Sequence, residues 1–549
     1  MKAAGSRLAG IPRWMLVVLV AVAAQAPIFN RSLVSLDEGQ LTAIGVRLLG
    51  GEILYRDIYT GIFPGIYWLA AALFAVFGTD VIVLRTAQVA VNALTAGALY
   101  VLVEPMVPGL LAWSVPLGYL ALIALSFPVL TMLTYSSLAL LAALGALIAA
   151  RRFLVTARPG CGVLAGVLLG LCVIFKQNYG ALALLSTALS ALLTRREGAL
   201  ADQSPWFALA WPTAAGLTVA LLTGTVLAAT GAWPAFVEST FLTIFHSQMQ
   251  AFDQPLPPVL GAHPTGDGLF LFLYSPGGLF GAMLHGQTWA RPWLLSLATR
   301  IGYGSAYVAI ASIPFVAWHF ASGKNATERV AARMFLPFAG LFFLGIFPSA
   351  IWSHLAAVYP PLLVVLAALV AATWPTLRSY GRVLSTVAGA AGCVAAFGIA
   401  AVAAGVSIDV RSSYGEKTRL PSASVLVSRR DAALYQAADE FLRGCAAAGA
   451  PILVVPDMPL LYVTSGHRNP TPYDLIIPGD VRDDVIVERM DRARVDCVVF
   501  DPAMYAQFAP FEQLFPHLHA YMTEHFETAR SMTVEGTTWQ FLTRRKVST

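Results

Sequence analysis

The sequence predicts a polytopic α-helical membrane protein with a soluble α/β domain at its C-terminal end. Hydrophobic residues make up 57% of the 549 residues and charged residues only 12%, whereas about a quarter of a typical soluble domain is charged. Apolar runs near the ~20 residues that span a bilayer recur as far as residue 406, and the composition becomes polar from residue 407. We therefore expect a transmembrane domain over residues 1–406 and a separate domain over residues 407–549.

The distribution of basic residues indicates how the chain lies in the membrane. The formal net charge is +5, and Lys and Arg occur in short loops rather than in one tract. This pattern reports membrane orientation and argues against a nucleic-acid partner. Lys2, Arg7 and Arg13 precede the first apolar run, Trp14–Phe29, which lacks a small-residue cleavage site. We therefore expect a retained first helix, a cytoplasmic N-terminus and an outer loop over residues 30–62.

The second apolar segment, Phe63–Gly78, decides the orientation of the spans that follow. If it crosses the membrane fully, later basic clusters such as Arg151-Arg152 lie outside, against the positive-inside rule. If it is short, re-entrant or lies on the surface, these clusters move inside together. We favour the second arrangement, which predicts about eleven full crossings among 11–13 helices. It also predicts a second outer loop over residues 230–291 and an outer, periplasmic C-terminal domain.

The tail alternates predicted helices with predicted strands. Amphipathic patterns predict helices over Arg429–Ala448 and Asp483–Arg494, and short apolar runs predict strands at Ile452–Val455 and Cys497–Phe500. A third helix is expected from Met504 to Arg530. The alternation predicts a small α/β sandwich with a partly parallel sheet.

The five cysteines show no CxxC pair and no metal-ligand spacing. Three of them lie in apolar runs, and only Cys445 and Cys497 lie in the polar tail. These two form a disulfide only if the tail lies in an oxidising compartment and the fold brings them together. The sequence leaves both a bonded and a free pair open.

The first outer loop carries adjacent carboxylates, Asp37 and Glu38, soon after the first span. Ser35-x-x-Glu38 fits a helix capping box, and apolar residues then recur with helical spacing, so we expect an interfacial amphipathic helix to begin here. Glu38 therefore has a structural explanation beside a catalytic one. The box does not need Asp37, and a further carboxylate beside the acyl chains is costly without a partner or a chemical role.

A second polar cluster, Arg56-Asp57, follows this predicted helix. A pair of Asp57 with Arg56 or Arg47 explains it, and Arg56 and Asp57 are also candidates for substrate binding. His354, at the end of a later span, is a candidate contact to sugar or phosphate. A histidine beside an interfacial tryptophan such as Trp352 is, however, common without function.

An exposed carboxylate with nearby cations suits one type of reaction. Transfer of a sugar from a lipid phosphate to a hydroxyl needs a base for the acceptor proton, whereas the phosphate leaving group needs cationic stabilisation rather than an acid. Asp37 is the candidate base, and Lys176, between two apolar runs, is the candidate phosphate cation. A snorkelling lysine at a helix end is the alternative. Gln177 and Asn178 are candidate substrate contacts beside it.

Several motifs along the chain together resemble one enzyme superfamily. After the acidic pair come Gly51-Glu52-Ile53-Leu54-Tyr55-Arg56-Asp57, Phe63-Pro64-Gly65-Ile66-Tyr67, Phe77-Gly78, Arg85, and the run from Gly170-Leu171 to Lys176. In their order and spacing they resemble the GT-C superfamily of membrane glycosyltransferases. Within this superfamily, the chain resembles the branch that contains the protein O-mannosyltransferases, the lipid A aminoarabinose transferase and the rhizobial galacturonic acid transferases of lipopolysaccharide core.

The resemblance implies inverting transfer from a polyprenyl-phosphate-linked sugar to a hydroxyl of a cell-envelope lipid, glycan or protein, on the outer side of the plasma (inner) membrane. It implies that Asp37 is the base and that Lys176 lies near the phosphate; Glu38 is kept beside Asp37 as a catalytic candidate. No cofactor is expected. We expect no metal ion, because Asp37-Glu38 is not the DxD pattern of metal-using oligosaccharyltransferases.

Two positions depart from the pattern of that superfamily. Phe63-Pro64 stands where the lipid A enzyme has Lys-Pro, so one expected phosphate cation is absent, and Tyr135-Ser136 stands where some members carry an acidic residue. The candidates to replace the missing cation are Arg56, Arg85 and Arg300.

Two other function classes remain open. One is a membrane transporter or lipid flippase without transferase activity, and the other is a non-catalytic membrane scaffold whose tail binds a partner. The hydropathy shows no evident two-fold repeat and few charges at mid-span depth, which argues against a transporter.

Overall fold

The computed structural model describes residues 11–34, 36–194, 197, 199, 205–243, 254–261, 263–323, 325–506 and 509–546. The chain forms two compact units, each assembled from separate segments. The first unit combines Met1–Phe29, Ala87–Thr223 and Asp253–Val410, and the second combines Asn30–Thr86, Gly224–Phe252 and Arg411–Thr549. The segment with the acidic pair and the tail therefore belong to the same unit. The domain boundary at residue 407 stays a prediction.

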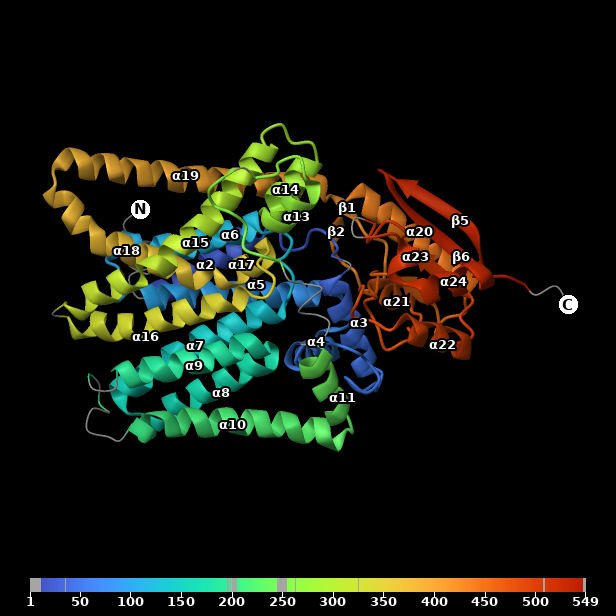
Figure 1. Cartoon of the computed structure of the whole chain (residues 1–549), viewed down its shortest axis with the longest axis horizontal. Helices are drawn as coiled ribbons and strands as arrows, with labels where there is room; N and C mark the ends of the chain where they lie inside the picture. Colours follow the sequence, from blue (N-terminus) through green and yellow to red (C-terminus); the bar gives the residue numbers. More distant parts are fainter. Residues whose placement is uncertain are drawn as a thin grey trace. The chain divides into compact units, whose positions relative to one another are not determined.

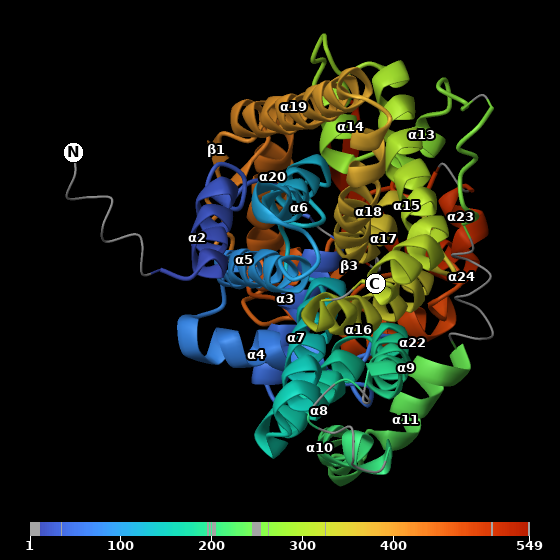
Figure 2. The ribbon, with the colours of Figure 1, turned by 90° about the vertical axis from the view of Figure 1, so that its left-hand side faces the viewer.

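The first unit is a bundle of long helices (Figure 1 and Figure 2). Its described helices are α2 (Arg13–Gln25), α5 (Val81–Val103, mostly in this unit), η1 (Gly109–Trp113), α6 (Ser114–Leu125), α7 (Tyr135–Thr156), α8 (Pro159–Phe175), α9 (Gln177–Thr194), α10 (Pro205–Ala229), α13 (Gly268–Tyr274), α14 (Gly277–Leu284), α15 (Pro292–Ala321), α16 (Ala326–Phe343), η5 (Leu344–Ile346), α17 (Trp352–Val358), α18 (Pro360–Ser379) and α19 (Arg382–Ser413).

Seven helices in the described part of the chain are long and apolar enough to cross a membrane: α5, α7, α10, α15, α16 extended to Ile346, α18 and α19. The protein is therefore an integral, multi-pass membrane protein. Burial differs sharply among these helices. Two thirds of the apolar window of α7 is buried, against 6% in α10 and 11% in α19. Long apolar helices that expose most of their side chains suit contact with lipid.

Small residues let α8 approach α10 closely. A β-carbon on Gly166 would collide with the carbonyl oxygen of Pro212, and one on Gly170 would lie 2.7 Å from the β-carbon of Val219. A stripe of small residues at four-residue spacing allows this kind of contact between membrane helices.

The second unit contains the short helices of the outer segments and the tail. Its described helices are α3 (Asp37–Leu49), α4 (Gly65–Phe77), α11 (Trp233–Val237), η3 (Glu238–Leu242), α20 (Arg429–Cys445), α21 (Leu460–Ser465), α22 (Asp483–Ala493), α23 (Phe511–Leu514) and α24 (Pro516–His525). The 13 residues of α4 rise only ~20 Å, less than the ~30 Å hydrocarbon core. The second apolar segment is thus short, as we expected, and its course in the membrane stays a prediction.

The tail contains a four-stranded sheet with the order β3-β4-β6-β5. Its strands are β3 (Leu453–Val455), β4 (Cys497–Phe500), β5 (Phe526–Val534) and β6 (Thr537–Arg544), and a separate short pair is formed by β1 (Glu416–Lys417) and β2 (Leu426–Val427). β3 pairs with β4 in parallel, and the other pairs are antiparallel. The predicted α/β sandwich with a partly parallel sheet is therefore confirmed.

The two faces of the sheet follow the alternation of side chains along each strand. Val454 and Phe541 lie in one hydrophobic core with side chains of α20. Leu453 and Leu542, one position away, lie in a second core with side chains of α22 and α24.

The predicted helix from Met504 to Arg530 is wrong at both ends: Met504 lies in a turn, and the first helix of this range, α23, begins at Phe511. The last helix, α24, ends at His525, and β5 and β6 form a hairpin. Glu535 and Gly536 at its turn have φ values of 49° and 81°. A two-residue turn with both residues at positive φ matches the twist of a hairpin, so the chain reverses here instead of continuing a helix.

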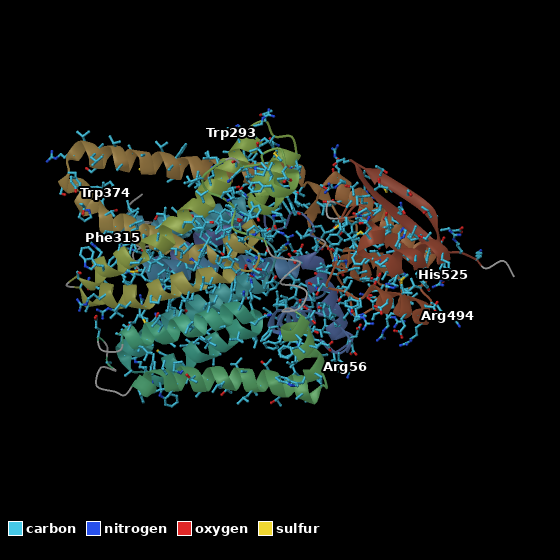
Figure 3. The ribbon with its side chains drawn as sticks, viewed as in Figure 1. Arg56, Trp293, Phe315, Trp374, Arg494 and His525 are labelled. Atoms are coloured by element: carbon cyan, nitrogen blue, oxygen red, sulfur yellow. A yellow bond between two sulfur atoms is a disulfide. The ribbon has the colours of Figure 1, made fainter. Side chains whose placement is uncertain are left out.

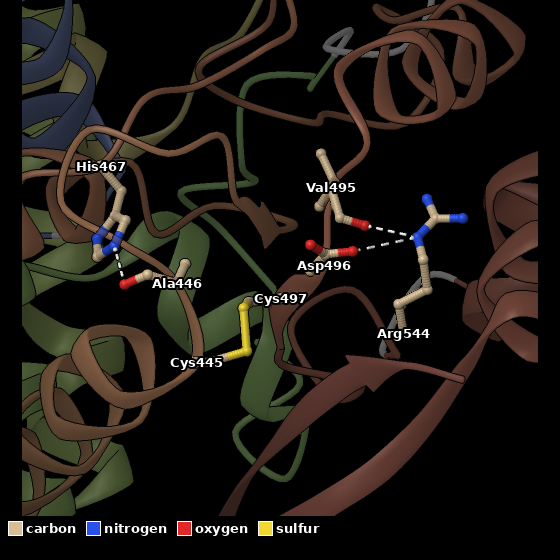
Figure 4. The surroundings of a disulfide bond; sticks show 7 residues. All are labelled: Cys445, Ala446, His467, Val495, Asp496, Cys497 and Arg544. Carbon is tan, nitrogen blue, oxygen red and sulfur yellow. Dashed lines mark hydrogen bonds and ion pairs between the residues drawn. A yellow bond between two sulfur atoms is a disulfide. The ribbon is translucent and has the colours of Figure 1, made fainter. Parts of the chain in front are cut away.

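Cys445, at the end of α20, is disulfide-bonded to Cys497, at the start of β4, with their Cα atoms 6.2 Å apart (Figure 4). Of the two alternatives that the sequence left open, the structure has the bonded pair. The bond fastens a helix that covers one face of the sheet to a central strand.

We predict that the Cys445→Ser/Cys497→Ser variant unfolds its C-terminal part at lower temperature than the wild type. A bond across 52 residues restricts the unfolded chain and contributes about 2–4 kcal/mol. Limited proteolysis of the full-length protein during a thermal ramp measures the loss. Cys161→Ser/Cys393→Ser, which changes two free cysteines, is the control. Equal protease sensitivity of both variants would contradict a stabilising bond.

Candidate functional site

The acidic pair lies at the first turn of α3. The helix begins at Asp37 with Leu36 at its N-cap, and Leu36 makes no side-chain capping hydrogen bond. This start lies one position later than the predicted capping box requires, and Ser35 is outside the described residues. Glu38 is buried and Asp37 is exposed. The two adjacent carboxylates therefore have different surroundings.

Glu38 forms a buried ion pair with Arg85 at the N-terminal end of α5. The Glu38 side chain is 1% exposed and that of Arg85 is 0% exposed. Arg85 Nη2 donates to Glu38 Oε2 at 2.8 Å, and Nε donates to Oε1. Arg85 also donates to the carbonyl oxygens of Arg31 and Ser32, each at 3.3 Å. Both residues, predicted as site candidates, thus have a structural role in holding α3.

Asp37 has a different position from its neighbour. Among the described residues, none forms a hydrogen bond or an ion pair with its carboxylate at the distances that define such contacts. Although the side chain is exposed, desolvation by the surrounding protein and repulsion from Glu38 raise the pKa of Asp37 above that of an ordinary aspartate. An accessible carboxylate with raised proton affinity is suited to accept a proton from a substrate.

The opposite end of α3 is fastened to the tail by Arg47. Its guanidinium donates to Asp474 at 2.9 Å and to Glu52 at 2.7 and 3.0 Å. The same group reaches the carbonyl oxygens of Asp57 at 3.2 Å and Thr471 at 3.1 Å. Asp474 is fully buried at its side chain. A network of charged hydrogen bonds of this kind fixes orientation more than it adds net stability, so α3 is held at both ends.

Arg56 and Asp57 form a local pair rather than joining the acidic pair. Arg56 Nη2 donates to Asp57 Oδ2 at 2.9 Å, and the backbone N–H of Ile53 donates to the same oxygen at 2.8 Å. The hydrogen bond from Arg56 lowers the pKa of Asp57. Half of the Arg56 side chain is exposed, and Figure 3 shows it at the surface. Asp57 therefore closes a turn, the simpler of the two explanations that the sequence left open.

Lys176 lies in the first unit, between α8 and α9, and is 8% exposed. Its ammonium donates to Ser136 Oγ at 3.0 Å and lies 3.8 Å from the ring centroid of Tyr179 and 5.2 Å from that of Tyr135. In the described part of the chain no carboxylate forms an ion pair with it. With one hydroxyl and two aromatic faces around it, the buried Lys176 side chain stays a candidate for binding an anion.

The other candidates near Lys176 belong to the same unit. Asn178 accepts from the backbone N–H of Tyr179 at 2.9 Å, and Gln177 begins α9. His354 Nδ1 lies 2.6 Å from the carbonyl oxygen of Ser349. Burial, and then the charge of Lys176, lower the pKa of His354 to about 4. His354 is therefore close enough to Lys176 for the charge of the lysine to lower the pKa of its imidazole, which is neutral at physiological pH.

The third arginine considered for the missing cation also has protein partners. Arg300 donates to the carbonyl oxygens of Val259 and Gly261 and so holds a loop of its own unit.

No group of three or more His, Cys, Asp or Glu side chains in the described residues is arranged to hold a metal ion. Sequence reasoning missed Asp474. It lies in no motif, and only the tertiary fold brings it to Arg47 of α3.

We predict that Glu38→Gln and Asp37→Asn differ strongly in stability. Glu38→Gln leaves the Arg85 guanidinium buried without a counter-charge, so the free energy of unfolding should fall by about 3 kcal/mol or more. Asp37→Asn removes no described contact and should change it by less than about 0.5 kcal/mol. Thermal unfolding of the two variants in detergent tests this. Similar melting temperatures would show that the pair with Arg85 does not hold α3.

Comparison with known proteins defines the fold. No protein-family model matches the sequence, and no curated protein matches it. The crystal structure of apo ArnT from Cupriavidus metallidurans is 14% identical, covers 99% of this chain and 98% of ArnT, and gives a TM-score of 0.55. The same ArnT bound to undecaprenyl phosphate is 14% identical, covers 98% of each chain and gives a TM-score of 0.50. At this identity the likeness concerns the fold, and the chain has the GT-C glycosyltransferase fold predicted from its sequence.

Proposed function

We propose that the protein is an inverting glycosyltransferase. It moves a sugar from a polyprenyl-phosphate-linked donor to a hydroxyl of a cell-envelope acceptor on the outer side of the plasma membrane. The observation that carries the proposal is the difference between Asp37 and Glu38: the ion pair with Arg85 occupies Glu38 and leaves Asp37 accessible. The fold supports it, and so does the undecaprenyl phosphate bound to the similar ArnT.

The proposed reaction moves one proton to a base and one electron pair to the leaving group. Asp37 takes the proton of the acceptor hydroxyl as its oxygen attacks the anomeric carbon from the face opposite the phosphate. The bond between the anomeric carbon and the phosphate oxygen breaks, and its electron pair leaves with the polyprenyl phosphate. Attack from the opposite face inverts the configuration, and a phosphate needs no acid to leave. One carboxylate base is therefore enough.

The leaving phosphate needs a positive charge, and Lys176 supplies it in this proposal. A phosphate oxygen near the Lys176 ammonium gives it the counter-charge that the described protein does not provide. Gln177, Asn178 and His354, which lie in the same unit as Lys176, are proposed to contact the donor. Arg56, Arg85 and Asp57 are proposed to act only by shaping the segment that carries Asp37, because each has a protein partner.

The disulfide supports the outer side as the place of reaction. Disulfides persist in oxidising compartments and are rare in the cytosol. The bond between Cys445 and Cys497 lies in the same unit as Asp37. This agrees with an N-terminus in the cytoplasm and a C-terminal domain in the periplasm, as the positive-inside rule predicts.

We predict that Asp37→Asn lowers the rate of sugar transfer by about 10²–10⁴-fold, the usual contribution of a general base. The measurement is transfer from a panel of polyprenyl-phosphate-linked sugars to a host envelope extract. Asp484→Asn, which changes an exposed aspartate, is the control. Because a base acts deprotonated, the wild-type rate should fall as the pH drops through the raised pKa of Asp37, at higher pH than for an ordinary aspartate.

Unchanged transfer by Asp37→Asn would overturn the assignment of the base. If the wild type transfers no sugar from any donor, and instead moves labelled lipid across vesicles, the flippase alternative gains support.

We also predict that Lys176→Met raises the Michaelis constant for the donor by about 10–100-fold, which corresponds to the ~1.5–3 kcal/mol of a charged hydrogen bond. The substitution keeps most of the side-chain volume and removes the charge. Lys417→Met, at an exposed lysine in β1, is the matched control. A change in the constant for the acceptor alone would contradict a role at the phosphate.

A further inference from the structure

The connection between α6 and α7, residues 126–134, is an irregular segment of the first unit, and most of it is buried. Backbone without helical hydrogen bonds is stable inside an apolar bundle only where its polar groups find partners. The carbonyl oxygen of Leu130 has two such partners on α5: Asn92 Nδ2 donates to it at 2.8 Å and Gln88 Nε2 at 3.4 Å. Two side-chain amides of α5 therefore hold the middle of this connection.

Asn92 is 0% exposed, and its amide uses all of its hydrogen-bonding capacity. Besides the bond to Leu130, Nδ2 donates to Gln25 Oε1 at 2.8 Å. Its Oδ1 accepts from Gln88 Nε2 at 2.8 Å and from the Tyr119 hydroxyl at 2.9 Å. One amide thus joins α2, α5 and α6 to the connection. A buried polar group whose bonds are all made favours one arrangement of the segments around it.

The start of the connection leads to His354, one of the residues proposed to contact the donor. Ser126 Oγ accepts from the indole N–H of Trp352 at 3.0 Å, and His354 follows two residues later in α17. A β-carbon on Gly302 of α15 would lie 2.6 Å from Cζ3 of Trp352. The indole therefore fills a tight place between α15 and the connection.

The end of the connection leads to Lys176. Thr134 is the N-cap of α7, and its side chain accepts from the backbone N–H of Ser137 at 3.1 Å. Ser136, in the first turn of the same helix, accepts from Nζ of Lys176 at 3.0 Å. The place where α7 begins therefore decides where the hydroxyl that contacts Lys176 lies.

We propose that Asn92 is a positioning residue of the donor phosphate site: through residues 126–134 it places Ser136, and with it Nζ of Lys176. The inference rests on the role at the phosphate proposed above for Lys176. Asn92 does not touch the donor. It acts through the backbone of the connection and the first turn of α7.

The physical reason is the cost of an unpaired buried carbonyl. If Leu130 loses its donor from Asn92, the connection shifts until the carbonyl oxygen finds another partner. The first turn of α7 moves with it, and Ser136 no longer directs Nζ of Lys176. A binding group has to stay within about 0.5 Å of its productive position. The donor should therefore bind less tightly, while the chemical step on bound donor is unchanged.

The alternative is that the amides only join helices, as buried polar side chains do in many membrane proteins. A substitution would then reduce the amount of folded enzyme, which lowers the maximal rate and leaves the Michaelis constant for the donor unchanged. The Michaelis constant therefore separates the two explanations.

The test is the Michaelis constant for the polyprenyl-phosphate-linked donor in Asn92→Leu, which has a similar volume and lacks the four hydrogen bonds. We expect a rise of about 2–10-fold, the equivalent of one net hydrogen bond. In the Lys176→Met background the same substitution should add no further rise, because it acts through Lys176. Ser190→Ala is the matched control: it removes a buried hydrogen bond to the carbonyl oxygen of Met334 elsewhere in this unit, and the constant should stay unchanged.

Ser126→Ala is a second, milder change of the same connection. It removes the acceptor of the Trp352 indole N–H and should also raise the Michaelis constant for the donor, without a further rise in the Lys176→Met background. If Asn92→Leu does not fold, Ser126→Ala decides alone.

The outcomes separate this inference from the proposed function. If the wild type transfers sugar and Lys176→Met raises the constant for the donor, but the folded Asn92→Leu and Ser126→Ala enzymes leave it unchanged, the positioning role is overturned and the transferase stands. The same holds if the rise is undiminished in the Lys176→Met background. If the wild type transfers no sugar from any donor, both proposals are overturned. A rise that disappears in the Lys176→Met background supports the positioning role.

Discussion

The buried ion pair between Glu38 and Arg85 is the interaction on which the arrangement of the acidic pair depends. Its two members are almost wholly removed from water, so breaking it by losing either partner leaves an uncompensated buried charge. The pair therefore fixes the first turn of α3 against the start of α5. It also occupies Glu38, which leaves Asp37 as the carboxylate that can accept a proton. One ionic contact thus decides which of two adjacent acids is chemically available.

The tail belongs to this arrangement because its backbone is joined to the outer segment. Leu426 donates to the carbonyl oxygen of Asn30 at 2.8 Å, and Ser32 donates back to Leu426 at the same distance. At the other end of α3, the Arg47 guanidinium binds the buried Asp474. Sheet-like pairing and a buried ionic contact position a helix more firmly than surface contacts do. A substitution deep in the tail can therefore change the position of Asp37 without touching α3.

The sequence was sufficient for features that depend on local pattern. Hydropathy predicted the membrane class, and strand and helix periodicity predicted β4 to the residue. The sequence was insufficient where contacts between segments far apart in the chain determine the position of a side chain. The partner of Glu38 lies 47 residues away, and nothing near Asp474 in the chain indicates that it pairs with Arg47 of α3. The missed hairpin is a different kind of error, because local sequence could have predicted it. Glu535-Gly536 is a typical hairpin turn, and residues of high β-propensity flank it on both sides.

The residue that stands beside Lys176 explains one departure from the superfamily that the sequence resembles. Ser136, at a position where some members carry an acid, places its hydroxyl 3.0 Å from the ammonium. A carboxylate there would form an ion pair with Lys176 and cancel the charge that a phosphate needs. Serine instead supplies one hydrogen bond, and the ring of Tyr179 adds a cation–π contact. These contacts hold the side-chain nitrogen in place without supplying a negative charge. The serine at position 136 is therefore compatible with the role at the phosphate that we propose for Lys176.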